Sequence, residues 1–265
     1  MKKFLLNKYT ISCIIVLFVV GVDIVLHKGM SRVMVSDTFT EQRTPSSFEA
    51  CNQPLLITNK RWVKAVNAVS NLQPLDSSTA GIEMDVYFDT LANTFFVYHD
   101  SDAISTLSIT AILDAWSAKK MKGSIWLDFK NLAAQNKLQA MLFLRKLRDQ
   151  YQLKNKIIVE ASTPGFLDVF CKEGFFTSYY VPFFNPYKMS EKQLMLTVDE
   201  MATQLAAHKV SALSGYYFQY PFLKKYFPDY PILTWTEGSA ISIVANYFNT
   251  NLLNDPQVAV VLFPQ

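Results

Sequence analysis

The chain has 265 residues, of which 50% are hydrophobic, and a formal net charge of +3. This composition supplies enough apolar side chains for a buried core and argues against a disordered chain. The small charge, without a basic run beyond the N-terminus, argues against nucleic acid as a partner.

The first predicted element is an apolar segment at the N-terminus. Three lysines in the first eight residues precede the apolar run 11–26, in which Asp23 is the charged residue. No small-x-small cleavage site follows the run, so we expect an uncleaved signal anchor over residues 1–27, with a cleaved signal peptide as the alternative. The lysines would keep the N-terminus in the cytoplasm and place the body in the periplasm or outside the cell. Asp23 is expected near the outer headgroups.

Residues 28–56 are predicted to form a polar linker, and residues 57–265 a folded domain with regular strand and helix patterns. Short β-rich runs occur at 61–67, 81–88, 124–130, 156–161, 177–183, 209–216, 231–236 and 257–263. A ninth run, 94–98, follows the second through a turn and is predicted to be a hairpin arm.

Segments with helical periodicity lie between these runs, at 107–119, 131–150, 164–173, 190–208, 219–227 and 239–251. Strands alternating with helices in one continuous chain predict an α/β fold, a (β/α)8 TIM-type barrel. The segment between the first two strands is a poor helix, and no helical segment follows the last strand. We therefore expect an irregular barrel or one that lacks the last helix.

Two cysteines, Cys51 and Cys171, lie outside the N-terminal segment. An exported location would permit a disulfide between them. Two isolated buried thiols are the alternative. The sequence has no Cys/His spacing of the kind that binds structural zinc.

Acidic residues recur where the predicted strands end. Glu83 and Asp85 end the second strand and point the same way, because they are two residues apart. Asp128 ends the next strand, and such strand ends face the catalytic mouth of a barrel. Three carboxylates in one mouth predict a bound divalent cation, Mg²⁺ or Ca²⁺. Lys130 beside them would contact an anionic oxygen, most simply that of a phosphate.

His99 follows the hairpin arm and precedes Asp100. Histidine is suited to proton transfer near neutral pH, so His99 is a catalytic candidate, with an ordinary surface or core position as the alternative. Aromatic residues also gather near the later strand ends. Tyr180 and Trp235 are candidates for substrate contact, although packing is the alternative role for the whole group, which comprises Tyr179, Tyr180, Tyr216, Tyr217 and Trp235.

The segments GIEMDVYFD, FFVYHD and IWLDFKNL together resemble the glycerophosphodiester phosphodiesterase-like superfamily, in particular its menorin-type branch. The short distance between His-Asp and Asp-Phe-Lys carries the resemblance to that branch. The resemblance implies a TIM-barrel phosphodiesterase whose divalent cation is held by Glu83, Asp85 and Asp128. It further implies acid-base catalysis by His99 and a phosphate contact by Lys130.

The sequence departs from the family at the end of the first predicted strand. The family places a histidine there, often followed by arginine, and the menorin-type pattern adds an asparagine. Lys64, Ala65 and Asn67 occupy these positions here. Two-histidine catalysis is therefore excluded. Lys64 would stabilise the transition state, or act as a base if desolvation lowered its pKa, and Asn67 would contact the substrate.

These patterns predict a membrane-anchored, metal-dependent phosphodiesterase that acts outside the cytoplasm on a lipid head group or a surface glycan. One alternative is a catalytically impaired barrel that binds a phosphorylated or acidic glycan or a protein partner. Another is a glycosidase in which Glu160 and Glu237 act as acid and base. For either glutamate alone, solvation or pairing with a nearby basic residue is the simpler role.

Overall fold

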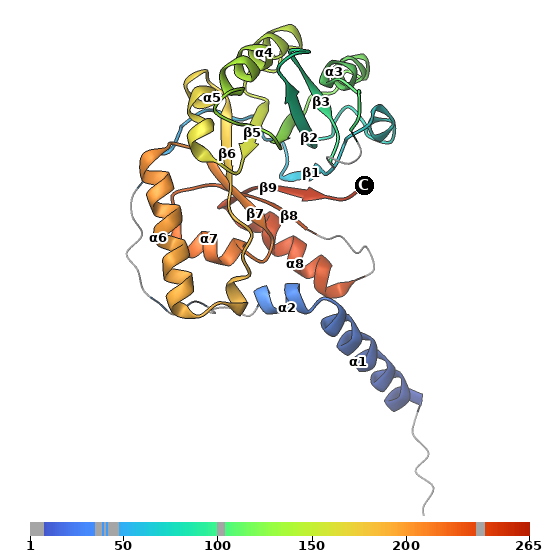
Figure 1. The fold of residues 1–265 in the computed structure, drawn as a ribbon. Coiled ribbons are helices and arrows are strands. Elements are labelled where there is room, and N and C mark those ends of the chain that lie inside the picture. The colour runs from blue at the N-terminus through green and yellow to red at the C-terminus, as the bar shows by residue number, and fades with distance from the viewer. Residues whose placement is uncertain (1–7, 35–38, 40, 42–47, 100–103, 237–241) are drawn as a thin grey trace, which may run out of the picture.

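The computed structural model describes residues 8–34, 39, 41, 48–99, 104–236 and 242–265. In this part of the chain, nine strands form one sheet in the order β1-β9-β8-β7-β6-β5-β4-β2-β3, and β1 also pairs with β2. The β1–β2 pairing closes eight parallel strands into a barrel, which confirms the predicted TIM-type fold (Figure 1). The strands are β1 (Arg61–Val63), β2 (Gly81–Asp89), β3 (Thr94–Val97), β4 (Ser124–Phe129), β5 (Ile157–Ala161), β6 (Phe176–Tyr180), β7 (Ala212–Tyr216), β8 (Ile232–Trp235) and β9 (Val258–Phe263).

Helices between the strands cover the outside of the barrel (Figure 1). The α-helices of the barrel are α3 (Ile109–Ala118), α4 (Lys137–Gln150), α5 (Asp168–Lys172), α6 (Glu191–Ala207), α7 (Tyr220–Tyr226) and α8 (Ile243–Asn254). Short 3-10 turns are η1 (Val69–Leu72), η2 (Pro164–Phe166) and η3 (Pro186–Lys188). The start of α6 is fixed by a capping box, in which Ser190 and Gln193 satisfy each other's backbone N–H groups.

The barrel is irregular in the two places expected from the sequence. Between β1 and β2 the described chain forms η1 in place of an α-helix, and no helix follows β9 in the described residues. The predicted hairpin is confirmed, since β3 pairs antiparallel with β2. Its turn is stabilised by Asp89, whose carboxylate accepts hydrogen bonds from the backbone N–H groups of Leu91 and Ala92.

Several predicted boundaries were wrong, and two of these differences have a clear local cause. The first strand, expected over 61–67, ends at Val63 because Ala65 has a left-handed φ of 58°, which extended pairing cannot accommodate. The helix expected over 131–150 begins at Lys137, since Asn136 accepts a hydrogen bond from Ala133 N and donates one to Asn131 O, holding the preceding residues in a turn. Residues 239–241 of the last predicted helix lie outside the described residues.

Strand alternation produces two separate cores. In β5, Ile157, Val159 and Ala161 belong to the large core under the helices, whereas Ile158 belongs to a smaller cluster inside the barrel. Trp62 lies at the centre of that inner cluster and leaves no room for a side chain at Gly81, where an added Cβ would be 2.2 Å from the indole. Apolar residues thus fill the barrel interior below the strand ends.

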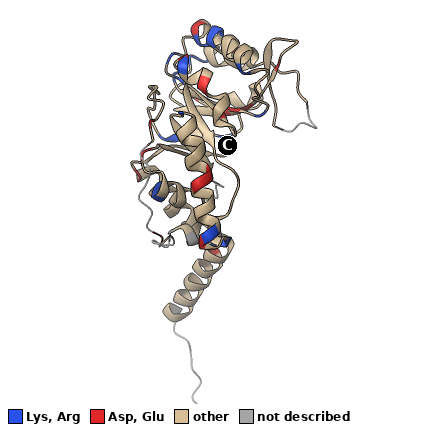
Figure 2. Ribbon diagram, turned by 60° about the vertical axis from the view of Figure 1, so that its left-hand side comes forward, with Lys and Arg blue, Asp and Glu red and all other residues tan. Residues whose placement is uncertain are grey.

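The N-terminal part of the chain forms two helices, α1 (Lys8–Leu26) and α2 (Lys28–Met34). α1 leads away from the barrel, and α2 lies beside α8 (Figure 1). Figure 2 shows that most of α1 carries no charged residue, and Asp23 lies in the last turn of the helix. α1 is long and apolar enough to cross a membrane, a property that signal sequences share.

The segment 28–56, expected as a linker, contacts the barrel at several points. α2 packs against α8, and the side chain of Phe39 is buried among Tyr187, Phe222 and Tyr226. Cys51 forms a disulfide with Cys171, which decides between the two alternatives left open for these cysteines.

Candidate active site

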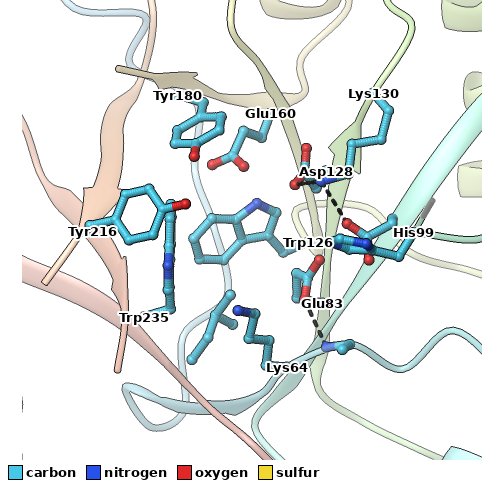
Figure 3. A pocket seen from close by; sticks show the side chains of 13 residues that line it. Lys64, Glu83, His99, Trp126, Asp128, Lys130, Glu160, Tyr180, Tyr216 and Trp235 are labelled. Carbon is cyan, nitrogen blue, oxygen red and sulfur yellow. Dashed lines mark hydrogen bonds and ion pairs between the residues drawn. The ribbon is translucent and has the colours of Figure 1, made fainter. Parts of the chain in front are cut away.

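A cavity of about 190 Å³ opens at the C-terminal ends of the barrel strands (Figure 3). The strand alternation that buries Ile158 and Phe176 inside the barrel brings Glu160 and Tyr180 to the cavity wall above them. One side of the cavity is acidic and the other is aromatic. The predicted site residues divide between these two sides.

The acidic side consists of Glu83, Asp85 and Asp128. Asp85 on β2 is in register with Asp128 on β4, and Glu83 is two residues before Asp85 on the same face of β2. One carboxylate oxygen from each lies within 4.8 Å of the others. Glu83 and Asp85 are almost fully buried, and Asp128 is partly exposed toward the mouth. The structure thus brings these three residues together, and their role as metal ligands stays a prediction.

Burial makes the ionised forms of these acids unfavourable. Desolvation, with the nearby charge of Asp85 as the second cause, raises the pKa of Glu83 to about 8. Desolvation also raises the pKa of Asp128, and the charge on Lys130 opposes that increase. A site that concentrates negative charge in this way gains stability from any cation that enters it.

Lys130 supplies a positive charge directly beside the acidic residues. Its Nζ lies 2.7 Å from Asp85 Oδ1 and also donates to Asp128 Oδ2. Partial burial alone would lower the pKa of Lys130, but the charges of Asp128 and Asp85 outweigh burial and raise it above its usual value. The ammonium group stays protonated at neutral pH and neutralises part of the acidic cluster.

The loop after β1 fixes the orientation of the acids. Asn67 donates to Asp85 Oδ2 over 2.6 Å, and its side-chain oxygen accepts from Asp85 N over 2.9 Å. The backbone N–H of Ala65 donates to Glu83 Oε2 over 2.8 Å. The left-handed backbone at Ala65, costly for a non-glycine residue, directs this N–H at the carboxylate. The structure places Asn67 against Asp85, where it positions a candidate metal ligand.

This donor set fits a divalent cation that prefers oxygen. Three carboxylates from two adjacent strands supply the type of ligand that Mg²⁺ and Ca²⁺ bind. Their outer contacts with Asn67 and with the Ala65 N–H are the kind of support that orients metal ligands. The acidic side can therefore hold a metal ion, with Lys130 at its edge.

His99 lies on the acidic side of the cavity (Figure 3). The chain that carries it is attached to β2, because Tyr98 N donates to Asp85 O and the Tyr98 ring stacks on Tyr87 at 4.1 Å between centroids. Tyr87 Oη donates to the backbone oxygen of His99. His99 is exposed to solvent, so its imidazole can exchange protons with water.

The opposite side of the cavity is aromatic. The ring centroid of Trp235 lies 5.4 Å from that of Tyr180 and 4.8 Å from that of Tyr216, both in edge-to-face contact. Lys64 extends into the cavity below them, with Nζ 5.9 Å from the Trp235 ring centroid (Figure 3). Lys64 and the acidic residues thus line the same cavity.

Glu160 lies between the two sides and is 2% exposed. Complete desolvation raises its pKa well above the usual range, with the charge of Asp128 as the second cause. The Ser214 hydroxyl on β7 opposes this increase by a hydrogen bond to the Glu160 carboxyl group. Two other buried atoms near Glu160, Trp126 Nε1 on β4 and Ser178 Oγ on β6, have no hydrogen-bond partner among the described residues. Burial of unpaired polar atoms is unusual and leaves room for water or ligand hydrogen bonds.

Two residues that line the cavity, Trp126 and Tyr216, were not among the predicted site residues. Trp126 lies two residues before Asp128 and therefore on the same face of β4, a relation that strand alternation alone could have shown. Tyr216 was grouped only with the general aromatic set. Glu237 and Asp100 lie outside the described residues.

Comparison with known structures shows the same barrel fold. A Galdieria sulphuraria protein assigned as a glycerophosphodiester phosphodiesterase aligns with a TM-score of 0.53 at 11% identity, over 78% of this chain and 94% of that one. A glycerophosphodiester phosphodiesterase of Parabacteroides distasonis aligns with a TM-score of 0.51 at 12% identity, over 78% and 93%. No protein-family model and no curated protein matches the sequence.

The comparisons show the fold of this chain. It is a closed TIM-type barrel similar to these two structures, and its strand ends carry an acidic cluster that could hold a metal ion. The identities are low, so the likeness extends to the fold. The resemblance to the menorin-type branch stays a prediction.

Proposed function

We propose that this protein is a metal-dependent phosphodiesterase. The observation that carries the proposal is the convergence of Glu83, Asp85 and Asp128, with Lys130 beside them, at the mouth of a barrel of this fold. Glu83, Asp85 and Asp128 would hold Mg²⁺ or Ca²⁺. A bound divalent cation would lower the charge at phosphorus and orient the phosphate.

The remaining site residues then have separate roles. His99, exposed at the mouth, protonates the leaving oxygen of the diester. Lys130 contacts a non-bridging phosphate oxygen while it holds Asp85 and Asp128. Trp235 and Tyr180 form the wall against which the non-reacting part of the substrate lies. Asn67 acts on the substrate indirectly, by fixing Asp85.

Lys64 occupies the sequence position at which the resemblance places the first family histidine, and its side chain lines the same cavity as the acids. An ammonium group there attracts the phosphate and stabilises the charge that develops on its oxygens. A deprotonated amine would instead serve as a base for the attacking water.

The proposed substrate is a phosphodiester outside the cytoplasm, in a lipid head group or a surface glycan. The Cys51–Cys171 disulfide supports this location, since such bonds persist in oxidising compartments. The apolar helix α1 supports attachment of the chain to a membrane, with the barrel on its outer side.

A second candidate function is binding without turnover. Its support is the replacement of the first histidine by Lys64, together with the engagement of Lys130 by two carboxylates. In this case the same cavity would bind a phosphorylated or acidic glycan, or an acidic segment of a protein partner.

The test is turnover of a chromogenic aryl phosphodiester by the full-length protein in detergent. We expect turnover that depends on Mg²⁺, Ca²⁺ or Mn²⁺ and falls at least about 100-fold in Asp85→Asn, more than the usual cost of losing an outer-shell partner. Asp89→Asn, in the exposed hairpin turn of the same strand, is the matched control and should leave turnover unchanged.

The Lys64→His variant separates the two candidate functions. An inactive parent protein together with activity in Lys64→His would contradict the enzyme and support a binding protein that lost its first histidine. Metal-dependent turnover in the parent, reduced in Lys64→His, would show that the lysine has taken over a catalytic role.

A further inference from the structure

The N-terminal apolar helix is attached to the barrel by a specific set of polar contacts. Asp23 Oδ2 accepts a hydrogen bond from Val244 N over 3.0 Å, at the start of α8. His27 Nδ1 lies 3.0 Å from Asp23 Oδ1 and 3.2 Å from the Oγ of Ser242, the residue that caps α8. The last turn of α1 therefore completes the N-terminus of a barrel helix.

α2 extends this attachment with apolar contacts. Met30 is 2% exposed and belongs to a cluster with Val244, Ala245 and Phe248 of α8. At Gly29 the backbone approaches the barrel so closely that an added Cβ would lie 2.7 Å from Tyr217 Oη. Asp23, His27 and Met30 thus attach this segment to the barrel, which is not expected of a segment removed as a signal peptide.

The attachment lies on the mouth side of the barrel. α8 begins after the C-terminal end of β8, and Tyr217 directly follows the C-terminal end of β7. A continuous series of ring contacts leads from the cavity wall to the attachment: Trp235–Tyr216 at 4.8 Å, Tyr216–Phe218 at 5.2 Å, Phe218–Tyr217 at 5.4 Å and Tyr217–Phe248 at 5.5 Å. The apolar helix therefore leaves the molecule beside the cavity opening.

Large apolar side chains are exposed on this same side. Phe183, which follows β6 and contacts Tyr216 at 5.0 Å between centroids, is 67% exposed. Ile243 and Tyr247 are each 61% exposed and, four residues apart, share one face of the first turns of α8. We call Phe183, Ile243 and Tyr247 the rim residues. Exposed apolar and aromatic groups next to a spanning helix are suited to the lipid headgroup boundary.

We propose that α1 remains on the mature chain and that its attachment turns the cavity mouth toward the bilayer, so that the substrate is a phosphodiester lipid taken from the adjacent leaflet. The orientation rests on the contacts of Asp23, His27 and Met30 with α8. The substrate class rests in addition on the phosphodiesterase function proposed above. A lipid that enters the cavity from the bilayer would pass along the aromatic rings that continue from the cavity wall to the rim residues.

The orientation is tested in nanodiscs by lipid quenching of a fluorophore attached to a single cysteine. Cys13 is exposed in α1, so the background variant is Cys13→Ser, which retains the Cys51–Cys171 disulfide. The fluorophore is attached in Phe183→Cys and, as control, in Lys146→Cys on α4, which lies far from α1 (Figure 1). Lipids brominated next to the headgroup serve as quenchers.

We expect quenching at position 183 to exceed that at position 146 by on the order of threefold, because a probe must reach the outer about 5–10 Å of the bilayer to be quenched. Adding Asp23→Ala and His27→Ala should remove most of this difference, while metal binding by the cavity stays unchanged. Equal quenching at both positions, or a purified chain that lacks residues 8–26 by mass, would overturn the proposed orientation.

The substrate class is tested with two matched compounds: a phosphodiester lipid in nanodiscs and its deacylated, soluble head-group diester. We expect turnover of the lipid to exceed that of the soluble compound, and to fall toward it when Asp23 and His27 are both replaced by Ala. Turnover of the soluble diester alone would overturn lipid entry. Turnover of neither compound would overturn the phosphodiesterase function, whereas the quenching result decides the orientation independently.

Discussion

The acidic side of the cavity and the region around Glu160 differ in how their buried polar groups are hydrogen-bonded. On the acidic side, Asp85 is held by Asn67 and Lys130, and Glu83 by the Ala65 N–H. Between the acidic and aromatic sides, near Glu160, the buried atoms Trp126 Nε1 and Ser178 Oγ have no hydrogen-bond partner among the described residues. The protein therefore holds the acidic groups in fixed orientations, whereas polar atoms near Glu160 remain able to form hydrogen bonds with water or a ligand.

Because of this difference, we expect the two regions to have different roles in binding. Groups that are already oriented can bind a cation without the cost of rearrangement. Groups that lack partners gain most when water or a ligand arrives, because unmade buried hydrogen bonds are costly. The acidic side would therefore bind the phosphate through a cation. The region around Glu160, together with the aromatic side, would determine which substituents of the phosphate are accepted.

The largest expected contrast is in metal affinity. Glu83→Gln removes a candidate metal ligand and should weaken Mg²⁺ or Ca²⁺ binding at least about 100-fold. Glu160→Gln replaces a carboxyl group whose pKa is raised by burial with an uncharged amide of similar shape, so we expect metal affinity to change less than about threefold. Isothermal titration of both variants measures the difference. Equal losses would show that Glu160 belongs to the metal site.

The second contrast concerns folding stability and compares the two lysines. Lys130→Met leaves Asp85 and Asp128 without their cation and should lower the free energy of unfolding by about 3 kcal/mol, the lower end for breaking a buried ion pair. Lys64→Met removes no ion pair that the described residues show, and its cost should stay within about 0.5 kcal/mol. Denaturant unfolding in chelator tests both. A similar cost for the two variants would contradict the comparison.

A third expected effect is a dependence of stability on pH. The folded pKa of Glu83, about 8, lies above its usual value of 4.5, so the folded protein binds more protons than the unfolded chain between these values. Without metal, stability should fall as the pH rises from 5 to 8, by at least about 2 °C in Tm. Saturating metal should remove this fall, and Glu83→Gln should reduce it. Constant Tm in chelator would contradict the raised pKa.

Much of the site could be predicted from local sequence patterns. The alternation of strands and helices gave the barrel, and the spacing of two residues placed Glu83 with Asp85 and Asp128 with Lys130 on shared faces. The boundary of β1 could not be predicted, because the left-handed backbone at Ala65 is stabilised by an N–H bond to Glu83, eighteen residues away in sequence. Likewise, the partner of Asn67 is set by the adjacency of β1 and β2.

The sequence by itself determined which side chains would reach the mouth, since strand periodicity and the polarity of parallel strands are local properties of the chain. Only the tertiary structure decided the partners of the charged side chains: Lys130 contacts two carboxylates, Glu160 is buried beside Ser214, and Asp23 of the N-terminal helix binds the start of α8. Burial and contacts between distant segments govern these outcomes, and neither is encoded in a single stretch of sequence.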